Sequence, residues 1–224
     1  MPPVTSGGEG PAVSDTGYGD FEFERRFFVR ELPPELLDEP EPVLIVQSYY
    51  LAQDGYALRL RVQASGVRMP LGPDADPLAV LDVVGDRFDF CAVTLKGPMN
   101  VGTRYEAERE IDVTVGTEMI RRGGSRIVKN RYAVWLGTDG WVVDVFGGAN
   151  RPLLIAECER SGPVTDLQIP AFCVTEVTDD ARFSNDGLAR TPYGVWAESF
   201  ERELAERGPR FLTDFGRNDL QRRG

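Results

Sequence analysis

The chain has 224 residues, a formal net charge of −11 and no histidine. An acidic surface would repel nucleic-acid phosphates, so general binding of DNA or RNA is not expected. The absence of histidine excludes Ser/His and Cys/His nucleophilic designs and removes the commonest transition-metal ligand. Any chemistry must therefore use carboxylates, Lys, Arg, Tyr and a hard metal ion.

The three cysteines, Cys91, Cys158 and Cys173, are widely spaced and form no CxxC pair. They indicate neither a disulfide framework nor a zinc site, and we interpret them as small buried apolar side chains. No stretch approaches the roughly 20 apolar residues that a membrane span requires, and no signal-like segment stands at the N-terminus. We expect a cytoplasmic protein without a membrane partner.

Three regions follow one another along the chain. Residues 1–20 are rich in Gly, Pro, Ser and Thr and predict a disordered leader. One domain is expected over residues 21–207, followed by a basic C-terminal tail over residues 208–224 that we expect to be frayed or loosely packed. Runs rich in Val, Ile, Phe, Tyr and Leu predict nine strands in the domain, at residues 21–30, 43–51, 56–63, 90–97, 103–115, 127–136, 141–147, 152–160 and 172–178.

Turn sequences at residues 53–55, 137–140 and 147–150 are short enough to join antiparallel hairpins. The proline-containing stretch 64–89 predicts a loop that leads into a short helix, as an insertion over the sheet. Near the C-terminus, Trp196, Phe200 and Leu204 recur at helical spacing. They predict an amphipathic helix that covers an opening or an outer face.

Charged residues recur at every second position along several strands, and such residues point to the same face. The charged positions are Glu22, Glu24, Arg26, Arg59, Arg61, Lys96, Arg104, Glu106, Glu108, Glu110, Lys129, Arg131, Asp144, Glu157 and Glu159. The opposite faces are assigned the apolar or small residues Phe21, Phe23, Leu58, Leu60, Val128, Ile155, Ala156 and Cys158. A solvated sheet face explains any one strand. Taken together, acidic strands and basic strands favour a closed antiparallel β-barrel of about eight strands, with both walls facing a lumen.

Buried Arg and Lys side chains are costly unless an anion enters the lumen, and a polyphosphate matches them because they supply charge-assisted bonds to its oxygens. The carboxylate pairs Glu22/Glu24 and Glu157/Glu159 would repel that anion. Their presence is explained if each pair holds Mg²⁺ or Mn²⁺, hard cations that prefer oxygen ligands and bridge to phosphate.

Motifs in a fixed order over about residues 21–190 resemble the CYTH, or triphosphate tunnel metalloenzyme, family. The opening run from Glu22 through Glu24 to Arg26 is similar to the family's ExExK start. The later motifs are Gln47-Ser48-Tyr49, Arg59-Leu60-Arg61, Thr94-Leu95-Lys96, Arg104 to Ile111, Lys129-Asn130-Arg131, Val143-Asp144, Ala156-Glu157-Cys158-Glu159 and the closing segments Glu176 to Asp179 and Phe183-Ser184-Asn185.

The resemblance implies an eight-stranded tunnel that grips a triphosphate and holds divalent metal. It implies phosphate contacts from Arg26, Arg59, Arg61, Lys96, Arg104, Lys129 and Arg131. It implies metal ligation by Glu22, Glu24, Glu157 and Glu159, with Glu108 and Asp144 as candidates for a second metal or for orienting basic side chains. Glu22, Glu24 and Arg26 form the expected catalytic set, and Tyr49 is expected to pack or hydrogen-bond at the tunnel.

One position departs from the family pattern, because Arg26 stands where the family has Lys. Arginine effectively cannot lose its proton, so Arg26 cannot act as a base. Its positive charge still allows it to bind phosphate. We expect metal-dependent hydrolysis of a small-molecule triphosphate, with inorganic tripolyphosphate first. The alternatives are adenylyl cyclase-type, RNA triphosphatase or thiamine triphosphatase activity, a non-catalytic polyphosphate or nucleotide sensor, and a plain barrel with a salt-bridged interior.

Overall fold

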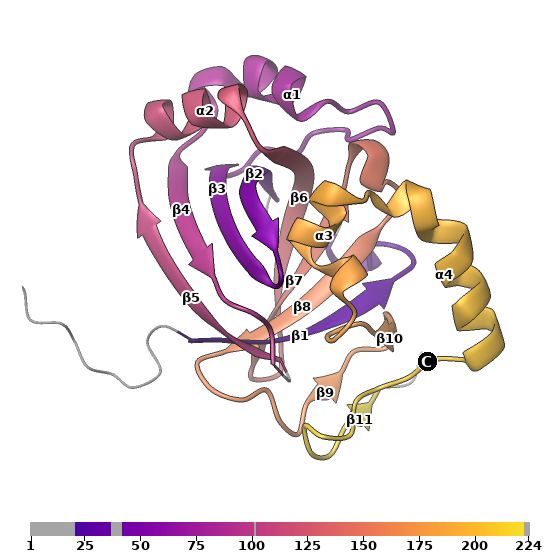
Figure 1. The fold of residues 1–224 in the computed structure, drawn as a ribbon. Helices are drawn as coiled ribbons and strands as arrows, with labels where there is room; N and C mark the ends of the chain where they lie inside the picture. The colour runs from indigo at the N-terminus through magenta and orange to yellow at the C-terminus, as the bar shows by residue number, and fades with distance from the viewer. Residues whose placement is uncertain (1–20, 37–41, 101, 222–224) are drawn as a thin grey trace, which may run out of the picture.

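The computed structural model describes residues 21–36, 42–100 and 102–221, so the expected leader lies outside the described residues. Its main strands are β1 (Phe21–Val29), β2 (Val43–Gln53), β3 (Tyr56–Ala64), β4 (Phe90–Lys96), β5 (Thr103–Glu110), β6 (Ser125–Leu136), β7 (Asp139–Phe146) and β8 (Leu154–Arg160). They pair in the order β1-β5-β4-β3-β2-β6-β7-β8, and β8 pairs again with β1. The antiparallel sheet therefore closes on itself as a barrel, as predicted (Figure 1).

Tight turns join β2 to β3 and β6 to β7, at two of the predicted positions. Asp54 and Gly55 both have positive φ, 52° and 83°. A Cβ atom at Gly55 would lie 2.9 Å from the Cα atom of Pro98. Glycine is thus favoured at position 55 both by the backbone conformation and by the close approach of the neighbouring loop.

Two helices, α1 (Pro77–Val84) and α2 (Val113–Arg122), cover one outer face of the barrel (Figure 1). Leu81 and Ile120 are fully buried there, in a cluster with Leu60 and Val128 of the sheet. The predicted helix in the insertion is confirmed as α1. The predicted strand 103–115 was too long, however, because the carboxylate of Asp112 accepts a hydrogen bond from the backbone N–H of Val115 at 2.9 Å and caps α2.

The ninth predicted strand, β10 (Cys173–Glu176), pairs with the second half of β1, beyond the residues that β5 reaches. Arg25 is fully buried on the outer face of β1 and donates hydrogen bonds to Glu176 at 2.6 and 2.8 Å and to Asn218 at 2.8 Å. The two-residue strands β9 (Gln168–Ile169) and β11 (Asp219–Leu220) pair in parallel. The described part of the C-terminal tail is therefore attached through β11 and the contact of Asn218 with Arg25, while most of its residues stay exposed or partly exposed.

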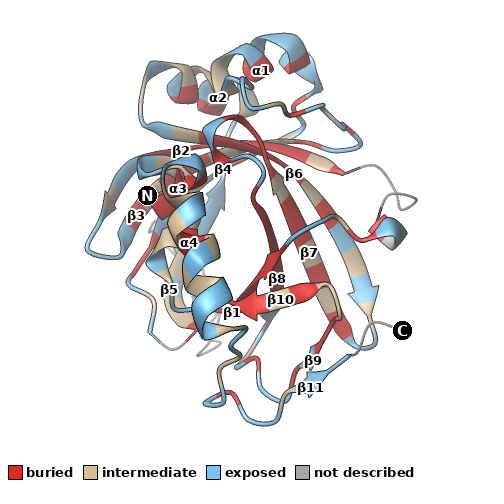
Figure 2. Ribbon diagram, turned by 90° about the vertical axis from the view of Figure 1, so that its right-hand side faces the viewer, coloured by how far each residue is buried: buried red, intermediate tan, exposed pale blue. Residues whose placement is uncertain are grey.

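Helices α3 (Asn185–Arg190) and α4 (Tyr193–Arg207) lie apart from α1 and α2 (Figures 1 and 2). Helix α4 contains the predicted Trp196, Phe200 and Leu204 stripe. Both helices close one end of the lumen through an apolar cluster that includes Phe28, Ile127, Phe146, Ile155, Phe183, Leu188, Tyr193 and Phe200. The placement of Ile155 on the outward face was wrong, since it shares the inner face with Glu157 two residues later.

Short 3₁₀ turns complete the described chain, at Pro34–Leu36, Gly85–Arg87, Gly148–Asn150 and Ala181–Phe183. All three cysteines are buried and unpaired, as predicted. Among the described helices, none is both long enough and apolar enough to cross a membrane.

Candidate active site

Charged side chains from six strands surround a cavity of about 270 Å³ inside the barrel. The described residues that line it are Phe21, Glu22, Glu24, Arg59, Arg61, Lys96, Arg104, Glu106, Glu108, Arg131, Glu157, Glu159 and Asn185. Most of the residues expected at the site are therefore brought together. Arg26, Lys129 and Asp144 do not line the cavity, and they contact residues that do.

On one wall, acids of β1 and β5 hold bases of β4 and β5. The carboxylate of Glu22 accepts hydrogen bonds from Arg104 at 2.6 Å and from Lys96 at 3.2 Å. Lys96 also lies 2.5 Å from a carboxylate oxygen of Glu106. A second nitrogen of Arg104 reaches Glu24 at 3.4 Å. These contacts follow from the register, which places Glu22 opposite Arg104 and Lys96 opposite Glu106.

Glu108 of β5 accepts hydrogen bonds from both arginines of β3. Its carboxylate accepts from Arg59 at 3.0 Å and from Arg61 at 2.8 Å, and the hydroxyl of Thr94 donates to it at 2.8 Å. The Glu108 side chain keeps 30% of its exposure, against 6% for Arg59. Glu108 therefore stands where the cavity meets solvent, and it orients both arginines.

Asp144 of β7 holds the two bases of β6. Its carboxylate is fully buried and accepts from Lys129 at 2.5 Å and from Arg131 through two bonds of 2.7 Å each. Arg131 also donates to Glu157 at 2.9 Å. Both oxygens of Asp144 are thus engaged, so the geometry supports its orienting role over its role as a metal ligand.

Arg26 lies beside the cavity, anchored to the segment that follows β10. Its Nε atom lies 3.3 Å from Glu24, and its terminal nitrogens donate to the carbonyl oxygens of Phe183 and Thr178 at 3.4 and 3.5 Å. Only 3% of the residue is exposed. The guanidinium is therefore fixed by the main chain as well as by an acid.

The acids and bases of the lumen neutralise one another. The expectation that the buried Arg and Lys side chains need an entering anion was therefore wrong. Glu22, Glu106, Glu108, Asp144 and Glu157 each contact at least one lumen base at 2.5–3.0 Å. An entering anion must therefore replace these acids as the partner of each base. Alternation along strands predicted that both signs face the lumen, but it carries no information about which residues pair.

Burial and crowding shift several pKa values in the lumen. Burial raises the pKa of Glu106 to about 7, and a hydrogen bond with Glu22 adds to the shift. Burial also opposes ionisation of Glu22, but Lys96 and Arg104 hold its pKa well below the usual range. Burial lowers the pKa of Lys129 to about 8 despite the attraction of Asp144. Proton binding in the lumen therefore changes close to neutral pH.

Comparison with known proteins shows the family of the chain. No family model matches it. Over 108 residues it is 34% identical to the inorganic triphosphatase of Acetivibrio thermocellus, an overlap that spans 47% of this chain and 69% of that protein. The chain belongs to the CYTH, or triphosphate tunnel metalloenzyme, family.

Two solved structures illustrate the likeness. The structure of the inorganic triphosphatase NE1496 is 28% identical and gives a TM-score of 0.48, covering 75% of this chain and 93% of that one. A Hippeastrum protein, a putative adenylyl cyclase described as having a dominant triphosphatase activity, is 18% identical with a TM-score of 0.39, over 63% of this chain and 80% of that one. The assignment of the fold rests on the strand pairing described above.

A CYTH-family lumen that holds a divalent cation needs oxygen ligands, which carboxylates supply. The carboxylate of Glu159 has no hydrogen-bond or ion-pair partner in the described part of the chain, and it lines the cavity. Its pKa is raised by burial and then by nearby Glu22 and Glu157. A cation would relieve this repulsion, so the residues fit a hard divalent ion. Within the described ranges, however, no three acids converge on one point, and Glu22 and Glu24 turn to Arg104 instead.

Three lining or contacting residues were missing from the expected CYTH site. Glu106 was predicted to face the lumen with Arg104 and Glu108 in the alternating run of β5, but it was given no role at the site. Thr94 shares a face with Lys96 two residues later, and its hydroxyl accepts from Arg59 at 2.9 Å. Asn185 comes from α3, which has six residues and gives no periodic signal.

One other prediction, for Tyr49, concerns the surroundings of the lumen. Tyr49 is buried and its hydroxyl accepts a hydrogen bond from the amide of Gln47 at 3.0 Å. Burial raises the pKa of Tyr49 to about 12. The side chain therefore stays neutral and serves packing at the apolar end of the lumen.

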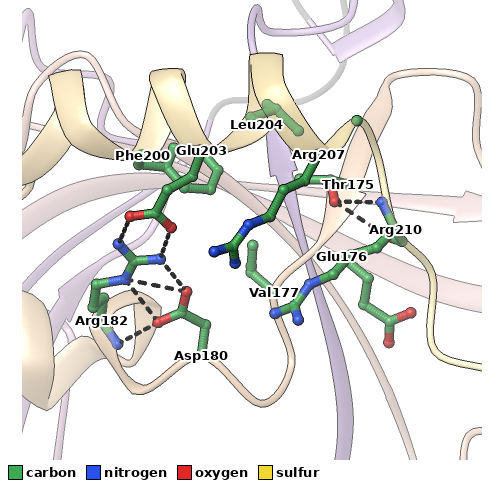
Figure 3. Close-up of a pocket in the computed structure, with 11 residues that line it drawn as sticks. Thr175, Glu176, Val177, Asp180, Arg182, Phe200, Glu203, Leu204, Arg207 and Arg210 are labelled. Atoms are coloured by element: carbon green, nitrogen blue, oxygen red, sulfur yellow. Dashed lines mark hydrogen bonds and ion pairs between the residues drawn. The ribbon is translucent and has the colours of Figure 1, made fainter.

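A second cavity, of about 290 Å³, lies outside the barrel between α4 and the segment after β10 (Figure 3). Arg182 bridges Asp180 and Glu203 there, at 2.8 and 2.9 Å. The side chains of Arg207 and Arg210 extend along the cavity without an acidic partner among the residues drawn (Figure 3). None of the residues expected at the CYTH site lines this cavity.

Proposed function

We propose that the lumen binds a triphosphate and hydrolyses it, with inorganic tripolyphosphate as the first substrate to consider. The observation that carries this proposal is the convergence of Arg59, Arg61, Lys96, Arg104 and Arg131 on one cavity that also holds carboxylates. The name of the relative from Acetivibrio thermocellus, inorganic triphosphatase, supports the same substrate. A cavity that is closed by apolar side chains at one end favours a short anion over a long polyphosphate chain.

Binding would proceed by exchange of partners. The triphosphate forms ion pairs with the guanidinium and ammonium groups, which supply charge-assisted and partly bidentate bonds to its oxygens. The carboxylates that lose their Arg or Lys partners then need another positive charge beside them, since an unpaired buried carboxylate is strongly unfavourable. This requirement explains why a lumen for an anion contains so many acids.

Mg²⁺ or Mn²⁺ would supply that charge. Glu22, Glu24, Glu157 and Glu159 are the proposed ligands, and Glu108 and Asp144 are better suited to orienting bases. When bound, a divalent ion neutralises charge on phosphoryl oxygens and lowers the pKa of water.

Side chains of the protein would bind the phosphates and stabilise the transition state. Arg59, Arg61 and Arg131 hold the phosphates and stabilise the negative charge of the transition state, which is the main requirement of phosphoryl transfer. Glu106, whose pKa is raised to about 7, can hold or release a proton at neutral pH. Arg26 does not line the cavity and acts on the site through Glu24, 3.3 Å from its Nε atom. As arginine it takes no part as a base.

A non-catalytic polyphosphate or nucleotide sensor is the second candidate. It is favoured by Arg26, which stands at the family's Lys position and is tied to two main-chain carbonyls. Arg26→Lys restores the family residue. In a sensor this change could switch hydrolysis on, whereas in a working enzyme it should alter the rate only modestly.

A phosphate-release screen tests the proposal. Purified protein is offered tripolyphosphate, ATP, thiamine triphosphate and pyrophosphate, with and without Mg²⁺ or Mn²⁺, and the ATP reactions are followed for cyclic AMP. We expect the fastest release from tripolyphosphate. Faster release from thiamine triphosphate, or formation of cyclic AMP, would replace the proposed substrate with one of the alternative activities of the family.

A further inference from the structure

Asn185 brings an uncharged polar group into a lumen that is otherwise lined by charges. Apart from Phe21, it is the one lining residue of the described chain that carries no ionisable group. It does not belong to the barrel and opens α3, whose N-cap Ser184 accepts a hydrogen bond from the backbone of Gly187 at 3.1 Å. Leu188 of the same helix is fully buried in the apolar cluster. The helix is thereby docked, and Asn185, which is partly exposed, is held in the lining of the cavity.

The orientation of the Asn185 amide is set by chemistry. The ammonium of Lys129 donates to Oδ1 of Asn185 at 2.9 Å. An ammonium group has donors only, so the oxygen of the amide must face Lys129 and the NH₂ group must face away from it. Lys129 is in turn fixed by Asp144 at 2.5 Å. A chain of three side chains therefore determines which end of the amide is free.

The free end is a donor without an acceptor. The Nδ2 atom of Asn185 has no hydrogen-bond partner among the residues that the structure describes. A donor fixed in this way suits an oxygen-rich anion, and its neutrality matters beside the apolar cluster, where burial of another charge would be costly.

We propose that Asn185 binds the triphosphate directly by donating a hydrogen bond from Nδ2 to a phosphoryl oxygen, with Lys129 as the residue that positions the amide. This inference rests on the proposed function, because it assumes that the lumen anion is a triphosphate. It adds a substrate contact from outside the barrel strands. It also gives α3 a role in binding in addition to its role in closing the lumen.

A purely structural role for Asn185 would be to hold Lys129, and substitution by Ala separates the two roles. Asn185→Ala removes both the donor to the ligand and the acceptor for Lys129. Asn185→Asp keeps an acceptor for Lys129 and strengthens it with charge, but it replaces the donor with a negative group that repels phosphate. Direct binding predicts that Asn185→Ala weakens affinity even though Asp144 still holds Lys129. A structural role predicts that Asn185→Ala lowers the melting temperature and leaves affinity unchanged, and the carboxylate of Asn185→Asp repels phosphate under either role.

The matched control is Asn130, which lies between Lys129 and Arg131 on β6 but on the outer face. Its amide donates to the carbonyl of Met69 at 2.7 Å and accepts from the N–H of Met69 at 3.3 Å. Asn130→Ala removes a buried amide of the same kind outside the lumen. It should lower stability without changing affinity for the ligand.

The experiment is calorimetric titration of the full chain and its variants with tripolyphosphate in the presence of Mg²⁺, with thermal melting of each protein without ligand. We expect Kd to rise about ten-fold or more in Asn185→Ala and further in Asn185→Asp, while Asn185→Asp without ligand melts no lower than Asn185→Ala. Asn130→Ala should keep the original Kd. An unchanged Kd in Asn185→Ala would overturn the inference while the proposed function stands. No binding by the unsubstituted protein would overturn both.

Discussion

Asp144 holds two buried cations at once, since its Oδ2 atom lies 2.5 Å from Nζ of Lys129 and 2.7 Å from the guanidinium of Arg131. Removal of one partner from a buried ion pair leaves uncompensated charge, which costs about 3–5 kcal/mol. Asp144→Asn should therefore lower the free energy of unfolding by about 3 kcal/mol or more, as measured by urea denaturation at pH 7.

The control for this prediction is Glu201→Gln. Glu201 pairs with Arg30 on the surface, at 2.9 Å, with both side chains at least 39% exposed. Such a pair contributes about 0–1 kcal/mol, so the control should be nearly neutral. A loss in Asp144→Asn as small as in Glu201→Gln would mean that Asp144 does not carry the two bases.

Metal and triphosphate should bind with strong positive coupling. In the structure the bases of the lumen are already paired with its acids, as in the 2.6 Å contact of Arg104 with Glu22. A triphosphate alone would leave the acids unpaired, and a cation alone would leave the bases unpaired. Titration of Mg²⁺ into the protein without triphosphate should therefore give weak or undetectable binding, and by linkage each ligand should tighten the other equally. Tight binding of Mg²⁺ by the empty protein would contradict this exchange of partners.

Glu106 should make stability depend on pH in the acid-to-neutral range. Burial raises its pKa in the folded state to about 7 from the ordinary value of 4.5. The folded protein then binds more protons than the unfolded chain between these values, so its stability falls as pH rises from about 4.5 to 7. Glu106→Gln removes this proton and should flatten that slope in urea denaturation at several pH values. Parallel pH profiles for the two proteins would argue against the raised pKa.

Arg61 should contribute to affinity more than to folding. Its side chain is 16% exposed at the mouth of the cavity, and Glu108 at 2.8 Å is its acidic partner. Contacts of a guanidinium with phosphate oxygens are worth roughly 1.5–3 kcal/mol, so Arg61→Ala should weaken tripolyphosphate binding about ten-fold or more. Arg121→Ala is the control, because Arg121 pairs with Asp82 on the outer helices. Equal Kd values for the two variants would remove Arg61 from the phosphate site.

The barrel and most of its lining could be predicted because strand alternation assigns side chains to faces. Glu22, Glu24, Arg59 and Arg61 were placed inside on that basis, and they line the cavity. Alternation places Ile155 on the face of Glu157, so its assignment to the outward face together with its neighbour Ala156 broke the period of two. Alternation does not report depth along the barrel axis, which is why the apolar end of the lumen was missed.

The ion pairs between neighbouring strands could not be predicted from the sequence either. The contacts of Asp144 with Lys129 and Arg131 depend on the register of β6 against β7, which places Asp144 opposite Arg131. Asn185 was missed as a lining residue because α3 is too short to show a helical period. The strand predicted through residue 115 failed because the cap at Asp112 overrode the β-propensity of Val113 and Val115.

Release of orthophosphate from tripolyphosphate by the unsubstituted protein and by Glu24→Gln, at saturating Mg²⁺ or Mn²⁺, tests the central claim most directly. Glu24 lines the cavity, is 4% exposed and contacts both Arg26 and Arg104. The Gln substitution keeps its shape and removes its charge. We predict metal-dependent phosphate release by the unsubstituted protein and none by a folded Glu24→Gln variant. Equal rates in the two proteins, or no release by either with either metal, would contradict hydrolysis of triphosphate in this lumen.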